Sequence, residues 1–425
     1  MKHPKRLFAI REHSTSVKRE CLAGLTVYFT TVYIIAINSR MIADSGIPPG
    51  AALLATVLVS FLGSLLTGLW ANAPIILIPG MGINALFSYT FVQEMGLSWQ
   101  AALGVVVVSG AVSLLAASTK LADLIADAIP ESLKKSITAG IGMLITFIGL
   151  QKGGLITSSD QTVVGIGDLG RSEALWTLFG LALIVILHAK KVPGSFLAGM
   201  LATTALAIGT GHQPETASDG SPFSLKEWLS VFGAADFEIG RITFWGATLI
   251  LSMVVILENV GLLQGLLEDK RKFRPSFQAV SLTASLSGLA GTSPTVCSLE
   301  SAAGIAAGGR TGLTAVVTGI LYLATIPLLP WIGWIPDSAV AAVLITVGGL
   351  MIREVQSIPF SDLTEGIPAF ITLSFIPFTF SIPDGIAFGF IAHALFKTAA
   401  GRRKEVRPAF FVISALFLFQ LALHA

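Results

Sequence analysis

The chain has 425 residues, of which 53% are hydrophobic and only 12% are charged, and its mean hydropathy is +0.79. A soluble domain of this size could not keep so apolar a surface in water, so the composition excludes a soluble globular protein and predicts an all-α polytopic membrane protein. The net charge of +2 comes from basic residues near the ends of apolar segments and gives no indication of nucleic-acid binding.

Apolar runs of about 16 to 22 residues follow one another along the chain, close to the length that crosses the hydrocarbon core of a bilayer. They lie at residues 22–39, 51–71, 75–93, 100–118, 135–150, 173–188, 195–211, 243–267, 276–291, 294–308, 313–331, 337–352, 366–382, 384–400 and 408–424. We expect fourteen spans. The last run follows a basic cluster, and the sequence leaves open whether it crosses the membrane, lies in the interface or packs on the bundle.

Lys and Arg are distributed unevenly over the predicted loops. With residues 1–20 as a cytoplasmic segment, twenty-two of these residues fall on cytoplasmic loops and five on outside loops. Basic residues near span ends are retained on the cytoplasmic side. The pattern therefore predicts that the N-terminus is cytoplasmic. We expect a multi-pass protein of the cell inner (plasma) membrane. No cleavable apolar core precedes the first span, so we expect that span to direct insertion.

Short segments recur in the same order in the two halves of the chain. They pair 35–38 with 256–259, 68–74 with 288–294, and 130–132 with 336–338. Each half holds seven predicted spans, and an odd number inverts the second copy relative to the first, as is typical of secondary transporters. The sequence thus predicts two inverted seven-span repeats.

Helix breakers interrupt the third and tenth spans. Residues 75–78 are β-prone and bounded by two prolines, so we expect them to be extended, with a half-helix beginning near Gly82. We also expect residues 295–298 to be extended, with a half-helix beginning near Glu300. Two short antiparallel strands at membrane depth would satisfy each other's backbone. The two half-helix N-termini would then point at one cavity.

Three polar side chains stand at the predicted midplane, Glu258, Glu300 and Asn84. Ionisable groups at this depth are costly and usually face a wet cavity that serves transport or proton relay. We expect Glu300 to accept two N–H bonds from a planar heterocycle, and Glu258 to exchange a proton because burial disfavours a charged carboxyl. The alternatives are a structural role for Glu258 and helix capping for Glu300 and Asn84.

Small residues beside these groups complete the predicted site. Ser298, Ser301 and Gly82 adjoin the two breaks, and we expect them to line the same cavity. Asp362 and Glu365 precede the thirteenth span, where we expect a solvated loop. The two cysteines, Cys21 and Cys297, give no disulfide framework.

The sequence shows no residue pattern that is typical of an enzyme or of a cofactor site. We find no nucleophile and base pair, no His/Cys cluster and no acid pair at metal-ligand spacing, so we expect neither an enzyme nor a metal or other cofactor. No phosphate-binding loop is present, so we do not expect this chain to power transport by hydrolysing ATP. A receptor or structural membrane protein is the remaining alternative, and it would not explain paired broken spans that carry acids.

At the breaks the sequence resembles the adenine/guanine/hypoxanthine permeases, the AzgA-like branch of the nucleobase transporter superfamily. The resemblance covers nearly the whole chain. Its most specific segments are residues 73–85, 300–313 and 386–390. It places the family's substrate-binding acid of span 10 on Glu300, its acid of span 8 on Glu258 and its asparagine of span 3 on Asn84.

The resemblance implies proton-coupled purine uptake by movement of two domains in an elevator-like cycle. The core domain would comprise 21–118 and 243–331 (spans 1–4 and 8–11), and the gate domain 119–242 and 332–400 (spans 5–7 and 12–14). Residues 401–425 hold the basic cluster and the last apolar run. The resemblance is also compatible with a homodimer.

Two other transport functions stay open. A uracil or xanthine permease would share the scaffold, and an anion exchanger or channel would share the architecture, although an anion would be repelled by two carboxylates. The sequence departs from the family at 258–262, where relatives usually carry an Asp in place of Glu258, and at Pro294, Cys297 and Ser298. These changes put the choice of purine and the shape of the cavity in question.

Overall fold

The structure is a computed structural model that describes residues 8–10, 12–119, 128–159, 163–211 and 225–424. Most of these residues are helical. The helices are α2 (Val17–Thr31), α3 (Tyr33–Ala43), α4 (Pro49–Trp70), α5 (Met81–Ala85), α6 (Trp99–Ser118), α8 (Glu131–Lys152), α9 (Ser172–Ala189), α10 (Ser195–Gly209), α11 (Leu225–Val231), α12 (Ile242–Leu266), α13 (Phe273–Ala290), α14 (Ser301–Ala306), α15 (Gly312–Leu323), α16 (Leu329–Ile332), α17 (Asp337–Met351), α18 (Leu363–Thr379), α19 (Ile382–Ala399) and α20 (Pro408–His424). A π-helix, Leu86–Glu94, continues α5.

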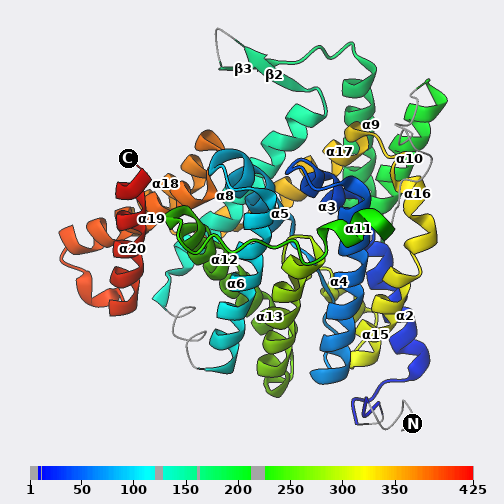
Figure 1. Ribbon diagram of the computed structural model, residues 1–425, viewed down its shortest axis with the longest axis horizontal. Coiled ribbons are helices and arrows are strands. Elements are labelled where there is room, and N and C mark those ends of the chain that lie inside the picture. The colour runs from blue at the N-terminus through cyan, green and yellow to red at the C-terminus, as the bar shows by residue number, and fades with distance from the viewer. Residues whose placement is uncertain (1–7, 11, 120–127, 160–162, 212–224, 425) are drawn as a thin grey trace.

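Four short strands form two separate two-stranded sheets. Strands β1 (Leu77–Pro79) and β4 (Thr295–Cys297) pair inside the bundle, and β2 (Ile156–Ser159) and β3 (Val163–Ile166) form a hairpin. Figure 1 shows the β2–β3 hairpin projecting from one end of the bundle, while α2 begins near the opposite end. The hairpin was not predicted from the sequence, because it lies in a loop between two apolar runs.

Every predicted apolar run overlaps at least one helix. Among the described residues, eight helical segments are long and apolar enough to cross a membrane, and shorter apolar helices accompany them. The chain is therefore a multi-pass membrane protein. The last run forms α20, which contacts α19, and Phe410 stacks on Phe390 with ring centroids 4.9 Å apart.

Polar residues at the helix starts fix several boundaries. The side chains of Ser16, Ser98 and Thr311 accept hydrogen bonds from backbone N–H groups in the first turns of α2, α6 and α15. Asp362 and Ser381 do the same for α18 and α19. Such caps satisfy donors that have no partner within the helix, which matters most where water is scarce.

One group of helices surrounds the β1–β4 pair. In it, α4 packs against α15 and α13, and α6 packs against α13 and α12. Glycines allow two of these contacts to be close. A Cβ atom added to Gly68 would lie 2.6 Å from the carbonyl oxygen of Gly312, and one added to Gly288 would lie 2.6 Å from that of Leu103. Gly68 and Gly288 are the matching residues of the recurring segments 68–74 and 288–294.

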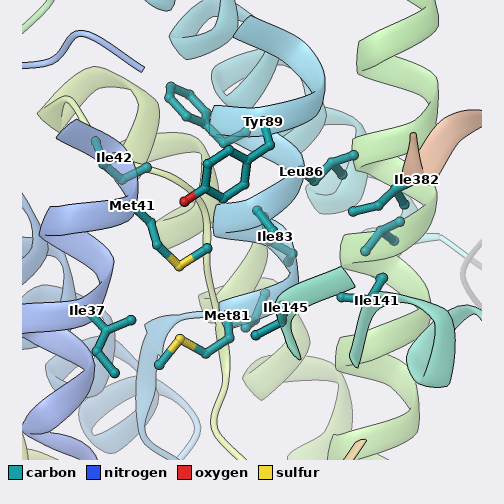
Figure 2. Close-up of a cluster of buried hydrophobic side chains, with 14 of the residues drawn as sticks. Ile37, Met41, Ile42, Met81, Ile83, Leu86, Tyr89, Ile141, Ile145 and Ile382 are labelled. Carbon is teal, nitrogen blue, oxygen red and sulfur yellow. The ribbon is translucent and has the colours of Figure 1, made fainter. Parts of the chain in front are cut away.

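A second group is built around α8. Helix α8 contacts α17 and α18, and α9 contacts α10 and α17. The two groups meet through apolar side chains, which Figure 2 shows as a buried cluster. The labelled members come from α3 (Ile37, Met41, Ile42), α5 and the π-helix (Met81, Ile83, Leu86, Tyr89), α8 (Ile141, Ile145) and α19 (Ile382). This interface lies directly beside the start of α5.

Candidate functional site

The two interrupted spans cross at a pair of short strands. Strands β1 and β4 run antiparallel, with Leu77 opposite Cys297 and Pro79 opposite Thr295. Both strands are fully buried. Backbone groups at this depth need protein partners because the bilayer supplies no water. The predicted antiparallel pair is confirmed, and it begins at Leu77 rather than at residue 75.

The first residue of each strand is held in the same way. The N–H of Leu77 donates to Ser64 Oγ, and the N–H of Thr295 donates to Ser287 Oγ, both at 3.2 Å. Ser64 belongs to α4 and Ser287 to α13, the helices that precede the strands. In both halves of the chain, a serine hydroxyl of the preceding helix thus anchors the first residue of the strand at membrane depth.

A helix begins directly after each strand. Helix α5 begins at Met81, after the extended residue Gly80, and α14 begins at Ser301, after Glu300. Both starts lie within one residue of the predicted positions. Pro79 supports the first break because its ring fixes φ and it has no N–H to donate.

Glu300 occupies the N-cap position of α14, but its side chain makes no capping hydrogen bond. The carboxylate instead accepts hydrogen bonds from two hydroxyl groups. Ser298 Oγ donates to Oε2 at 2.5 Å, and the hydroxyl of Tyr33 donates to Oε1 at 3.3 Å. The side chain is half-buried. The capping alternative for Glu300 is therefore wrong.

Glu258 lies in the middle of α12 and faces the start of α5. Its Oε1 atom is 3.5 Å from the position that a Cβ on Gly80 would take. Within the part of the chain that the structure describes, its carboxyl group has no hydrogen bond or ion pair. The side chain is half-buried. The same Cβ on Gly80 would lie 2.8 Å from Cγ2 of Val296 in β4, and Glu300 follows that strand in the chain, so the two acids share one region.

Asn259, the neighbour of Glu258, joins α12 to the strand pair. Its Oδ1 accepts a hydrogen bond from the N–H of Cys297 at 2.7 Å, and its Nδ2 donates to the carbonyl of Val255. The N–H of Cys297 would otherwise be an unpaired donor in an apolar interior, which is costly. Asn259 therefore fixes the height of Glu258 relative to β4.

Asn84 is fully buried in α5 and does not cap it. Its Oδ1 lies 2.6 Å from Ser293 Oγ, and the single hydroxyl hydrogen of Ser293 is shared between this oxygen and Oδ1 of Asn38, which is 3.2 Å away. The Nδ2 atom of Asn84 has no hydrogen-bond partner among the described residues. The capping alternative for Asn84 is wrong, and an unused amide donor stands beside the strand pair.

The remaining predicted residues have structural contacts. Ser301 Oγ accepts a hydrogen bond from the N–H of Ile76 at 3.1 Å, which ties α14 to the approach of β1. A Cβ on Gly82 would lie 2.8 Å from Cγ2 of Ile141 in α8. Gly82 therefore lets α5 approach α8 closely. Both residues position the break rather than offer a free polar group.

Comparisons with known proteins decide the family. The profile described as the Permease family, Xan_ur_permease, matches residues 18–388. The chain belongs to this permease family. The permease is 44% identical over 384 residues to the nucleobase transporter PlAzg2 of Paenibacillus larvae, which covers 89% of this chain and 77% of that protein.

Two further relatives cover almost the whole permease. It is 35% identical to the adenine permease AdeP of Escherichia coli, over 98% of this chain and 95% of that one. It is 34% identical to the guanine/hypoxanthine permease PbuO of Bacillus subtilis, over 98% and 99%. Among solved structures, the transmembrane domain of the cyanobacterial bicarbonate transporter BicA superimposes with a TM-score of 0.65 at 15% identity, over 88% of this chain and 97% of that one. That likeness concerns the fold alone.

Sequence analysis missed Tyr33, which links the permease's two helix groups. Its hydroxyl donates to Glu300, and its ring stacks on Phe196 of α10 with centroids 5.0 Å apart. The side chain is 2% exposed. A tyrosine in an apolar first span gives no signal by itself, because aromatic residues in such helices usually pack against neighbours or lipid.

Sequence analysis also missed Glu20, a fully buried acid in the first turn of α2. Its carboxylate accepts hydrogen bonds from the N–H of Arg310 (2.9 Å), the N–H of Thr311 (3.3 Å) and the hydroxyl of Thr314 (2.6 Å). These donors lie at the start of α15, where a carboxylate is favoured by the helix dipole. Glu20 therefore fastens α2 to α15.

The expectation of a solvated loop at Glu365 was wrong. Ser132 of α8 donates a hydrogen bond to Glu365 at 2.5 Å, and Lys397 of α19 forms an ion pair with it at 2.7 Å. The Lys397 side chain is 3% exposed. These contacts join three helices of the group around α8. The partners lie 233 and 32 positions away along the chain, and neither was visible from the local sequence.

Proposed function

We propose that this permease carries purine nucleobases into the cell together with protons. The observation that carries the proposal is the placement of two half-buried acids at the crossed strands: Glu300 directly precedes α14, and Glu258 of α12 faces the start of α5. A neutral purine presents N–H donors that a carboxylate can accept. An anion would meet two acids, and within the described ranges no Lys or Arg pairs with either.

The Glu300 carboxylate has room for a substrate. An ionised carboxylate offers about four acceptor positions on its two oxygens. Ser298 and Tyr33 each use one of them, on different oxygens. Two positions stay available for adjacent N–H groups of a flat ring, and the present hydroxyl contacts hold the carboxylate in place for that contact.

Glu258 is suited to carry the proton. Because its carboxyl has no partner in the described part of the chain, it can gain a proton without breaking a hydrogen bond or ion pair. Its protonated form would also become a donor toward a substrate at the neighbouring break. We assign to Asn84 the second polar contact with the purine, because its Nδ2 is an unused donor.

The transport cycle we propose moves a core domain against a gate domain. The core comprises 21–118 and 243–331, and the gate comprises 119–242 and 332–400, as two inverted seven-span repeats with the N-terminus in the cytoplasm. Two matched pairs support the repeat: Gly68 with Gly288 at close helix crossings, and Ser64 with Ser287 at the strand starts. The apolar interface of Figure 2 suits sliding because it contains few polar bonds to break.

Purine binding to purified protein tests the assignment of Glu300. We expect Glu300→Gln to weaken purine binding by roughly 100-fold, because two charge-assisted hydrogen bonds to the substrate are lost. The matched control is Glu173→Gln, at an exposed acid in the first turn of α9. Unchanged purine affinity in Glu300→Gln, with an unchanged thermal unfolding midpoint, contradicts the proposal.

Uptake by reconstituted vesicles tests the substrate class and the coupling. Vesicles with an imposed pH gradient receive labelled adenine, with unlabelled guanine, hypoxanthine, xanthine and uracil as competitors. We expect guanine and hypoxanthine to compete with adenine, and we expect collapse of the pH gradient to stop accumulation. Competition by uracil or xanthine alone would instead support the pyrimidine or xanthine branch of the superfamily.

A further inference from the structure

An apolar groove of 350 Å³ runs between α2 and α10. Leu25, Thr26 and Phe29 line it from α2, and Leu197, Ala198 and Leu201 line it from α10. Three of these side chains are partly open to the surroundings: Leu25 is 38% exposed, Phe29 44% and Leu201 53%. In a membrane protein such side chains meet hydrocarbon, so the groove is shaped to hold an acyl chain rather than a polar solute.

The groove ends at a basic turn. Val192 separates Lys190 and Lys191 from the turn residues Pro193 and Gly194, which also line the groove. Both lysines are exposed, and neither side chain has a hydrogen bond or ion pair in the described part of the protein. Lys191 adopts a left-handed conformation (φ 56°) that turns the chain between α9 and α10. Two lysines without a partner among the described residues therefore precede the turn at which the lining of the groove begins on α10.

This combination of apolar groove and paired lysines matches the two parts of an anionic phospholipid. Basic pockets between membrane helices on the cytoplasmic side bind anionic head groups. We propose that the α2–α10 groove binds one acyl chain of an anionic phospholipid whose phosphate is held by Lys190 and Lys191. Both features are needed to select an anionic phospholipid. The lysines alone would bind any phosphate, and the groove alone would bind the acyl chain of any lipid.

The site lies where the two helix groups touch. A Cβ on Gly194, which has φ 72°, would lie 3.1 Å from the carbonyl oxygen of Phe29, so α10 starts against α2 at this point. In the proposed function, α2 belongs to the core and α10 to the gate. A lipid bound here would contact both domains and move the equilibrium between their positions. This consequence rests on the proposed function, whereas lipid binding itself rests only on the groove and on the predicted cytoplasmic side of Lys190 and Lys191.

Lipid retention by the purified full-length protein tests the binding site. The protein is reconstituted in vesicles of equal phosphatidylglycerol and phosphatidylcholine, extracted in mild detergent, and its bound lipids are measured by native mass spectrometry. We expect one retained phosphatidylglycerol in the wild type and at least a fivefold loss in the double variant Lys190→Gln, Lys191→Gln. The matched control, Arg403→Gln with Lys404→Gln, removes two exposed basic residues elsewhere and is expected to retain the lipid.

A second variant tests the groove without changing charge. Leu201→Trp fills the space between α2 and α10 and is expected to expel the lipid. Leu175→Trp is its control, because Leu175 of α9 is also 53% exposed but does not line the groove. Added glycerol phosphate distinguishes a free phosphate site from a lipid site, and we expect it not to displace the phosphatidylglycerol.

The proposal is overturned if the wild type, the double lysine variant and Leu201→Trp retain phosphatidylglycerol equally. All three proteins must be monodisperse for this comparison. Displacement by glycerol phosphate alone would also overturn it, since the acyl chain would then be unnecessary. Purine binding to Glu300 is measured on the same samples. Its loss with normal lipid retention, or the reverse, separates failure of the proposed function from failure of the lipid site.

Discussion

Lys152 Nζ lies 2.7 Å from Oδ2 of Asp44, and this ion pair joins the last turn of α8 to the end of α3. The hydroxyl of Tyr89 donates to the same carboxylate at 2.7 Å. Beside it, Arg40 of α3 reaches the carbonyl of Ile335 at 2.8 Å. These polar contacts join the helix group around the strands to the group around α8 at one end of the bundle. Relative movement of the two groups must break them.

The Asp44–Lys152 pair is therefore expected to bias the transport cycle. Lys152→Gln removes one charge and should shift the balance of conformations about twofold to fivefold, as partly exposed ion pairs contribute about 0.2–1 kcal/mol. The distance between spin labels placed on α3 and α8 measures this shift. The charge-reversed double variant Asp44→Lys, Lys152→Asp should restore the wild-type distribution. The control is Arg171→Gln, whose exposed partner Asp168 lies three residues away in the same segment; an equal shift there would contradict the assignment.

Tyr33→Phe is expected to raise the KM for purine roughly fivefold with little change in maximal uptake. The variant keeps the stack on Phe196 but removes the hydroxyl donor to Glu300, and one hydrogen bond contributes about 1 kcal/mol. Tyr28→Phe is the control, because the Tyr28 hydroxyl contacts Thr325 instead. A merely structural role of Tyr33 would lower the unfolding temperature and leave KM unchanged.

Glu258→Gln is expected to remove the pH dependence of uptake while purine still exchanges across the membrane. Gln has a similar shape but cannot bind or release a proton, and Glu258 has no partner within the described residues whose loss would disturb the fold. Counterflow of labelled purine, measured without a pH gradient, reports exchange, and accumulation under a gradient reports coupling. If the variant accumulated purine as the wild type does, Glu258 would have no part in the proton relay.

Asp362 provides the pH control for that experiment. Hydrogen bonds from Thr364, together with Arg402, hold the pKa of Asp362 below its usual range, and this residue lies before α18 begins. A carboxyl with a lowered pKa contributes stability that is present above its unfolded pKa, about 3.9, and is lost only as the pH falls through the lower folded value. Asp362 therefore stays ionised between pH 5 and 8. Asp362→Asn should leave the pH profile of uptake unchanged.

The sequence predicted the interrupted spans well because their signals are local. Proline and glycine restrict the backbone at Pro79 and Gly80 regardless of distant residues, and an acid in an apolar run stands out by composition alone. The positions of α5 and α14 were accordingly predicted within one residue. The sequence could not predict which hydroxyl groups hold Glu300, because Tyr33 lies 267 positions away from it.

Long-range contacts also explain the other omissions. Glu20 sits among basic residues at the start of the first span and looks like a solvated end, yet it bonds to backbone groups 290 positions later. Asn84 and Glu300 both had the local pattern of helix caps, and only tertiary contacts with Ser293 and Tyr33 decide against it. Local rules thus placed the helix breaks, whereas tertiary packing assigned the side-chain partners.

The matched glycines test the internal repeat through stability. Gly68→Ala and Gly288→Ala should each destabilise the fold by about 1–3 kcal/mol, because a new Cβ would lie 2.6 Å from a carbonyl oxygen of the crossing helix and overpacking has this typical cost. Gly261→Ala in α12 is the control, because among the described residues no atom outside the local helix backbone lies within 4 Å of a Cβ added there. That variant should be neutral or slightly stabilising, since alanine favours a helix over glycine by about 0.5–1 kcal/mol. Thermal unfolding in detergent measures all three, and a tolerant Gly68 beside an intolerant Gly288 would show that the two helix crossings are not equivalent.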